Sequence, residues 1–193
     1  MSGLRILSGD AKGRYLKTLD IEDLSIRPML GRMKKSLFDI LRPRLAGSEF
    51  LDLFAGTGAV GLEALSNGAR RAVFIEQSPV SLKLIKENLD MLGWGARGLI
   101  QRADVTKGLE WLKFKFDIIF MGPPYKDDKK RPLALTSPAL AAVARAGLLL
   151  DEGCVICQHH KKESLETPAG FGMFRQEKYG DTLLSFFEKV IDV

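Results

Sequence analysis

Apolar runs alternate with helix-like segments through the middle of this chain. The nearly continuous apolar runs are expected to be strands, at residues 50–54, 71–76, 98–101, 116–121 and 155–158. Segments of helical character follow the first four runs, at residues 60–66, 79–91, 107–112 and 132–145. Strands that are apolar on both faces and alternate with helices predict a mostly parallel sheet covered on both sides. This is a Rossmann-like α/β architecture.

The first 44 residues differ from the rest in pattern and in charge. Residues 4–8 and 14–19 predict a hairpin, and residues 27–41 predict a helix that closes at Pro43. This segment holds ten Lys and Arg against five Asp and Glu, whereas residues 45–193 hold nineteen of each. The division predicts a basic nucleic-acid-binding extension (1–44) on a neutral domain (45–193), although a solvated basic face fits the charge alone equally well. The cations expected to contact nucleic acid are Arg5, Lys12, Arg14, Lys17, Arg27, Arg32, Lys34 and Lys35.

Two further features lie toward the carboxyl end of the chain. The apolar runs 173–179 and 182–190 flank Gly180-Asp181, a hairpin signal, so an antiparallel strand pair is expected to close the sheet. Cys154 and Cys157 have a spacing typical of redox or zinc sites, but residues three apart in a strand point to opposite faces. We therefore expect neither a metal nor a disulfide at these cysteines.

A glycine-rich turn follows the first expected strand. Residues 52–58 read Asp-Leu-Phe-Ala-Gly-Thr-Gly, and glycines at such a turn let a nucleotide-like cofactor approach the backbone. Residues 56–61 also match the G-x-G-x-x-G dinucleotide fingerprint. Glu76 ends the next strand, where a carboxylate can accept hydrogen bonds from both ribose hydroxyls. These features fit NAD and S-adenosylmethionine alike.

Three observations favour S-adenosylmethionine. The Asp52 carboxylate would repel a pyrophosphate, but it can engage the cationic amino group of a methionine directly or through water. The turn lies about fifty residues into the chain rather than at its start. Asp104 ends the third expected strand, where its side chain can accept a hydrogen bond from the adenine amino group. The residues expected to bind the cofactor are Asp52, Phe54, Ala55, Gly56, Thr57, Gly58, Glu76, Gln77, Asp104 and Val105.

A proline-rich turn follows the fourth expected strand. Gly122-Pro-Pro-Tyr125 resembles the Asp/Asn-Pro-Pro-Tyr/Phe signature of amino methyltransferases that act on adenine, cytosine or guanine. An exocyclic amine is a poor nucleophile, so such a site must align its lone pair with the sulfonium methyl. The resemblance implies that the Asp/Asn oxygen and the first proline's carbonyl hold the amine, while Tyr125 stacks on the base. The expected catalytic residues are Gly122, Pro123, Pro124 and Tyr125.

Further motifs in the same order resemble the bacterial 16S ribosomal RNA guanine-N2 methyltransferase family. They are Arg5-Ile-Leu-Ser-Gly9, Lys12-Gly-Arg14, Arg27-Pro28 with Arg32, the segment 36–41, the segment 61–65 and Tyr179-Gly-Asp-Thr182. This resemblance covers nearly the whole chain. It implies a class I methyltransferase fold, S-adenosylmethionine as donor, and a guanine 2-amino group in the small ribosomal subunit as acceptor, with residues 1–44 contacting the RNA. We expect a cytoplasmic monomer that needs neither a membrane nor a metal.

Position 122 departs from the family pattern. Gly122 lacks the expected side-chain oxygen, and the loss of such an acceptor costs about 1.5 to 3 kcal/mol, or roughly 10- to 150-fold in rate. A water molecule or Asp127 could replace that oxygen. Three other hypotheses stay open: an RNA-binding assembly protein with weak or lost catalysis, an amino methyltransferase acting on adenine in DNA and, more distantly, a nicotinamide-dependent oxidoreductase.

Overall fold

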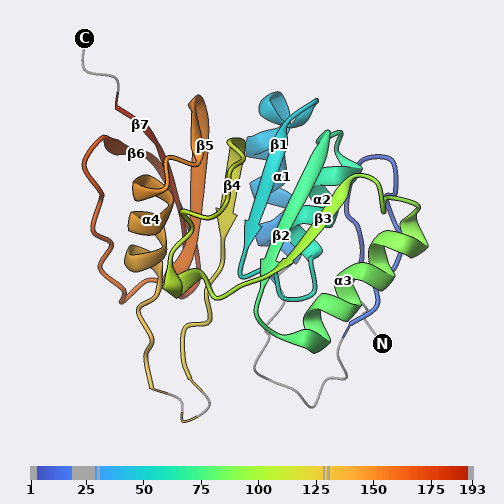
Figure 1. The fold of residues 1–193 in the computed structure, drawn as a ribbon, viewed down its shortest axis with the longest axis horizontal. Coiled ribbons are helices and arrows are strands. Elements are labelled where there is room, and N and C mark those ends of the chain that lie inside the picture. Colours follow the sequence, from blue (N-terminus) through green and yellow to red (C-terminus); the bar gives the residue numbers. More distant parts are fainter. Residues whose placement is uncertain (1–3, 19–28, 30, 128, 130, 191–193) are drawn as a thin grey trace.

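The protein forms one seven-stranded sheet with helices on both faces (Figure 1). The structure, a computed structural model, describes residues 4–18, 29, 31–127, 129 and 131–190. The elements in chain order are α1 (Gly31–Leu45), β1 (Glu49–Leu53), α2 (Ala59–Ser66), β2 (Arg71–Glu76), α3 (Pro79–Leu92), β3 (Gly98–Arg102), the 3-10 turn η1 (Val105–Lys107), β4 (Phe116–Met121), α4 (Thr136–Arg145), β5 (Leu149–His160), β6 (Phe171–Tyr179) and β7 (Thr182–Lys189).

The sheet has the order β3-β2-β1-β4-β5-β7-β6. The first five strands in that order pair in parallel, while β7 is antiparallel to both β5 and β6. A mostly parallel sheet closed by an antiparallel pair is therefore confirmed. The strand order reverses beside β1, so the carboxyl ends of β1 and β4 form the edge where an α/β sheet binds ligands.

Each face of the sheet carries its own apolar core. One core joins the sheet to α1, α2 and α3, and the other joins it to η1 and α4. Figure 1 shows α4 on one side of the sheet and α1 and α2 on the other. Cys154 lies in the first core and Cys157 in the second, so the two sulfurs diverge as expected, and burial raises the pKa of both thiols.

Three predicted helices differ from the structure. Helix α4 begins at Thr136, four residues later than predicted, because Pro132 bridges to Lys126 and Leu133 N donates to Tyr125 O in the preceding loop. Residues 107–112 do not form a helix, because Gly108 adopts a φ of 97° and turns Leu109 and Leu112 into the core after η1. Helix α1 does not close at Pro43 but continues to the buried Leu45. A proline in the last helical turn removes only one backbone hydrogen bond, and burial of Leu45 offsets that loss.

The predicted strands also differ at two places. Strand β5 begins at Leu149, six residues earlier than predicted. The sequence pattern missed this start because the exposed Asp151 and Glu152 interrupt the apolar run, where the register with β4 shifts. The predicted hairpin is reduced to antiparallel pairing around the single bridge between Arg5 and Tyr15, within the described part of the chain. Residues 27 and 28, where the first predicted helix begins, lie outside the described residues.

A buried ion pair joins the amino-terminal segment and α1 to α2. The Lys34 ammonium lies 2.8 Å from the Glu63 carboxylate, and it also donates to the Arg5 carbonyl at 2.8 Å. The same carboxylate accepts hydrogen bonds from the backbone of Leu7 and from the backbone and hydroxyl of Ser8. Both charged side chains are at most 2% exposed. The segment is therefore fastened to the sheet domain by charge-assisted hydrogen bonds as well as by apolar packing.

No helix in the described ranges is long and apolar enough to cross a membrane. The same ranges contain no group of three or more His, Cys, Asp or Glu placed to hold a metal ion.

Candidate active site

The glycine-rich turn carries the chain from β1 to α2 in an unusual backbone conformation. Phe54, Gly56 and Gly58 adopt φ values of 60°, 54° and 76°. A positive φ is uncommon for a residue with a side chain, and an aromatic residue is strained there. Backbone strain of this kind gathers at binding and catalytic sites. The turn is closed by hydrogen bonds from Ala55 N to Ile75 O and from Gly58 N to Ala55 O.

Asp52 lies beneath this turn and is 1% exposed. Its carboxyl group accepts a hydrogen bond from Gly61 N at 2.9 Å. Burial raises the pKa of Asp52 to about 8, and the nearby Glu76 contributes to that rise, while the bond from Gly61 opposes both effects. The site thus holds a carboxyl group that is neutral below about pH 8 and that an incoming cation would ionise.

Glu76 holds the turn from the neighbouring strand. One carboxylate oxygen accepts from Gly56 N at 2.8 Å, and the other accepts from Gln77 N at 2.8 Å and Ser78 N at 2.9 Å. These bonds fix the carboxylate between the glycine turn and the end of β2. Each carboxylate oxygen has two lone pairs, so the group keeps acceptor capacity for a ligand hydroxyl.

Asp104 lies at the end of β3 beside a hollow of about 430 Å³. Its Oδ1 accepts from the backbone and hydroxyl of Thr106, and these bonds lower the pKa of Asp104. Oδ2 has no hydrogen bond from the described residues. The hollow is lined by Gln77, Arg102, Ala103, Asp104 and Lys107. Thr57 and Val105, also expected at the cofactor site, are buried.

The proline turn lies next to the glycine turn. Met121 pairs with Leu53 across the parallel β1–β4 ladder, and Gly122 N donates to Leu53 O at 3.4 Å. Both turns therefore leave the same edge of the sheet from neighbouring strands. Pro123 is buried and Pro124 is exposed.

Tyr125 is fixed by partners from β5 and β7. Its hydroxyl donates to Thr182 Oγ1 at 3.4 Å and accepts from Gln158 Nε2 at 3.1 Å, and burial raises the pKa of the phenol. Its ring meets His160 edge-on, with the ring centroids 5.9 Å apart. The tyrosine ring is thus held rigidly at the end of the proline turn. Sequence reasoning missed Gln158, whose only signal is a polar residue at the end of an apolar run.

Asp127 does not supply the oxygen that Gly122 lacks. Its Oδ1 accepts from Lys129 N and Arg131 N, and its Oδ2 accepts from Arg131 Nε at 2.7 Å. These bonds hold the pKa of Asp127 below its usual value. The carboxylate is therefore satisfied within its own loop.

The expected nucleic-acid contacts divide into exposed and buried cations. Arg5, Lys12, Arg14, Lys17, Arg32 and Lys35 are exposed, and Arg27 lies outside the described residues. Lys17 and Lys35 form exposed ion pairs with Glu87 and Asp39. Lys34 instead has a structural role, because its ammonium is buried against Glu63 and cannot reach a phosphate.

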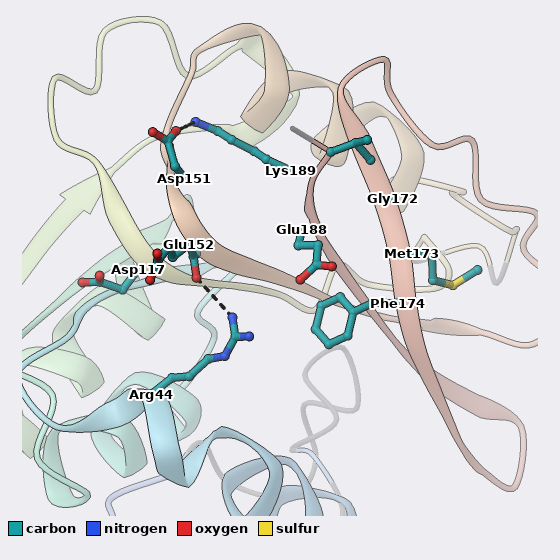
Figure 2. Close-up of a pocket in the computed structure, with 11 residues that line it drawn as sticks. Arg44, Asp117, Asp151, Glu152, Gly172, Met173, Phe174, Glu188 and Lys189 are labelled. Atoms are coloured by element: carbon teal, nitrogen blue, oxygen red, sulfur yellow. Dashed lines mark hydrogen bonds and ion pairs between the residues drawn. The ribbon is translucent and has the colours of Figure 1, made fainter. Parts of the chain in front are cut away.

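A larger hollow of about 810 Å³ lies at the opposite edge of the sheet (Figure 2). It is formed near the amino ends of β4 and β5, where Arg44 donates to the Glu152 carbonyl and Lys189 pairs with Asp151. Asp117 at its wall accepts from Glu49 N. This hollow is separate from the two turns, and it lies at the edge of the sheet that α/β folds do not use for ligands.

Comparisons with known proteins fit this architecture. Residues 4–188 match the family described as Conserved hypothetical protein 95. The chain belongs to this family. It is 32% identical over 190 residues to YlbH of Bacillus subtilis, a candidate rRNA methyltransferase, with 96% of this chain and 99% of the relative covered.

Two other proteins similar to this member of the Conserved hypothetical protein 95 family match it over most of its length. Ribosomal RNA small subunit methyltransferase D of Haemophilus influenzae is 30% identical over 184 residues, covering 92% of this chain and 89% of the relative. The solved structure of yhhF, a candidate methyltransferase of Escherichia coli, has a TM-score of 0.82 at 26% identity and covers 96% of this chain and 97% of that one. The family resemblance and the class I methyltransferase fold are thereby confirmed.

Proposed function

We propose that this chain transfers a methyl group from S-adenosylmethionine to the 2-amino group of a guanine in 16S ribosomal RNA. The observation that carries the proposal is the adjacency of the glycine turn after β1 and the proline turn after β4, linked by the bond from Gly122 N to Leu53 O. A relative named ribosomal RNA small subunit methyltransferase D supports the acceptor class. Methyl transfer needs donor and acceptor in line and in contact, which neighbouring strand ends provide.

The residues at the glycine turn fit the three chemical parts of the donor. Asp52 is a buried carboxyl group suited to the methionine ammonium, and Glu76 is a fixed carboxylate with one acceptor position left for a ribose hydroxyl. Asp104 keeps one oxygen for the adenine amine at the rim of the hollow formed with Gln77 and Ala103. Bound there, the donor supplies a methyl group activated by a sulfonium. Phe54, Ala55, Gly56, Thr57, Gly58 and Val105 complete the proposed donor-binding set.

The residues at the proline turn fit a flat acceptor with an amino group. Pro123 offers its main-chain carbonyl to one amine hydrogen, and the prolines limit the motion of that carbonyl. Tyr125, anchored by Gln158 and Thr182, offers a rigid ring on which a base can stack. Alignment rather than acid–base strength is the expected source of the rate, since the amine needs orientation toward the methyl carbon.

Residues 1–44 are proposed as the RNA-contacting extension of a catalytic domain spanning 45–193. Their exposed cations, Arg5, Lys12, Arg14, Lys17, Arg32 and Lys35, can neutralise phosphates of a bound RNA. The Tyr179 hydroxyl bonds to the Ser36 hydroxyl on α1, so this extension contacts the β6–β7 hairpin, whose turn lies between Tyr179 and Thr182.

The function is tested with labelled S-adenosylmethionine and small subunits from a strain that lacks the modification. We expect one methyl group per subunit, recovered as N2-methylguanine after nuclease digestion and mass spectrometry. Naked 16S RNA and DNA serve as parallel acceptors. Methylated adenine, or no incorporation at any protein concentration, would contradict the proposal. Subunit binding without incorporation would instead support an assembly protein.

The RNA-contacting role is tested by replacing Arg5, Arg14 and Arg32 together with glutamine. We expect the KM for subunits to rise about tenfold or more. The slope of the logarithm of the binding constant against the logarithm of the salt concentration should become shallower by roughly 0.7 to 0.9 per lost phosphate contact. A matched variant replaces Lys113, Lys115 and Arg145 with glutamine, three exposed cations outside residues 1–44. Equal effects in both variants would show that net charge, not a local contact, determines binding.

A further inference from the structure

An amide group from the neighbouring strand faces the space that Gly122 leaves. A Cβ atom placed on Gly122 would stand 3.2 Å from the Phe120 ring and 3.7 Å from Oε1 of Gln158. Met121 pairs with Cys157 in the parallel β4–β5 ladder, so Gly122 and Gln158 are the next residues in register. Neighbours in register point to the same face of a sheet. The head of Gln158 therefore lies beside the space that a side chain at position 122 would enter.

Tyr125 determines which end of the Gln158 amide faces Gly122. The tyrosine hydroxyl donates its hydrogen to Thr182 Oγ1, so it acts as an acceptor toward Gln158. Gln158 Nε2 fills that position at 3.1 Å. Because the nitrogen end is bound to Tyr125, the oxygen end is directed toward Gly122.

The structure assigns to Gln158 the role of second acceptor for the guanine amine, in place of the side-chain oxygen missing at position 122. The inference rests on the proposed function and adds a catalytic residue to it. An amide oxygen is the acceptor that an asparagine at position 122 would present, here supplied by β5. The backbone of Gly122 does not adopt a positive φ, so its conformation alone does not require glycine.

The chemistry requires an acceptor that orients the amine without removing its proton. The amine nitrogen forms a bond to the methyl carbon as the carbon–sulfur bond breaks, and the electron pair of that bond goes to sulfur. The nitrogen becomes cationic and then releases a proton to water. Hydrogen bonds from the amine to Gln158 Oε1 and the Pro123 carbonyl orient the lone pair and strengthen as positive charge develops.

The test compares Gln158→Ala, Gly122→Asn and the double variant in the subunit methylation assay. For Gln158→Ala we expect kcat to fall about 10- to 100-fold, because one acceptor of a developing cation is lost. The affinity for S-adenosylhomocysteine and the KM for subunits are expected to stay within about twofold. Adding Gly122→Asn to Gln158→Ala is expected to restore kcat to within about threefold of wild type, since the introduced asparagine returns the oxygen from β4.

Gln176→Ala is the matched control, because it removes an exposed side-chain amide from β6 whose nitrogen donates to Ser185 Oγ, and it leaves Tyr125, Gln158 and Thr182 in place. Its kcat is expected to fall less than about threefold. A Gln158→Ala variant with wild-type kcat would overturn the role of Gln158 and leave the proposed function standing. A double variant that melts like wild type but does not regain kcat would do the same. A wild-type chain that methylates no subunit would overturn the proposed function together with the role of Gln158.

Discussion

Replacing Lys34 with methionine is expected to lower the free energy of unfolding by about 3 to 5 kcal/mol. Methionine keeps most of the apolar stem, so the change removes chiefly the ammonium that lies 2.8 Å from Glu63 and 2.8 Å from the Arg5 carbonyl. The Glu63 carboxylate then stays buried without a cation, which is the costly outcome of breaking a buried pair. For a chain of this size we expect the melting temperature to fall by roughly 6 to 20 °C.

The neighbouring lysine supplies the control for this loss. Lys35 pairs with Asp39 at 2.7 Å, but its side chain is 70% exposed. An exposed pair contributes about 1 kcal/mol or less, so Lys35→Met should leave the melting temperature nearly unchanged. Adding Glu63→Gln to Lys34→Met should recover part of the loss, because it removes the unpaired buried charge. Equal melting shifts for the two single variants in denaturant or thermal unfolding would contradict a central role for the Lys34–Glu63 pair.

Local sequence patterns predicted the sheet well because they report burial directly. A run such as Phe116–Met121 is apolar with little interruption because the strand is covered on both faces, and its bounds matched the structure. The glycine turn was also recognisable, since its two positive-φ glycines are the residues that such a conformation favours. Gly180-Asp181 likewise indicated the closing hairpin, which is confirmed.

Contacts between distant segments could not be predicted from those patterns. Lys34 was assigned to the RNA surface by its charge, because nothing in its own segment shows that Glu63 on α2 pairs with it in the interior. Gln158 was missed for the same reason, since its position beside Gly122 depends on the β4–β5 register. Which side chain lies beside another on a neighbouring strand depends on the order and register of the strands in the sheet. Local sequence patterns do not contain that information.

Replacing Asp52 with asparagine is expected to stabilise the protein at high pH. The folded chain keeps the Asp52 proton up to about pH 8, whereas an unfolded chain releases it near the ordinary pKa of 3.8. Between these values unfolding releases a proton, so the wild-type free energy of unfolding falls by up to about 1.4 kcal/mol per pH unit as pH rises. The introduced amide can accept the same bond from Gly61 N without that penalty. We expect unfolding titrations to favour the variant by roughly 2 to 5 kcal/mol at pH 8 and by almost nothing below about pH 4.

The same substitution is expected to weaken binding of the proposed donor. A methionine ammonium favours the ionised form of Asp52, so wild-type affinity for S-adenosylhomocysteine should rise with pH between about 6 and 8, with proton release on binding. The Asp52→Asn variant should lose that pH dependence and bind about 10- to 150-fold more weakly at about pH 8. Asp104→Asn is the control, because the pKa of Asp104 is lowered and its carboxylate stays ionised over this range. Calorimetry in buffers of different ionisation enthalpy measures the released proton, and unchanged release in the Asp52→Asn variant would show that another group titrates.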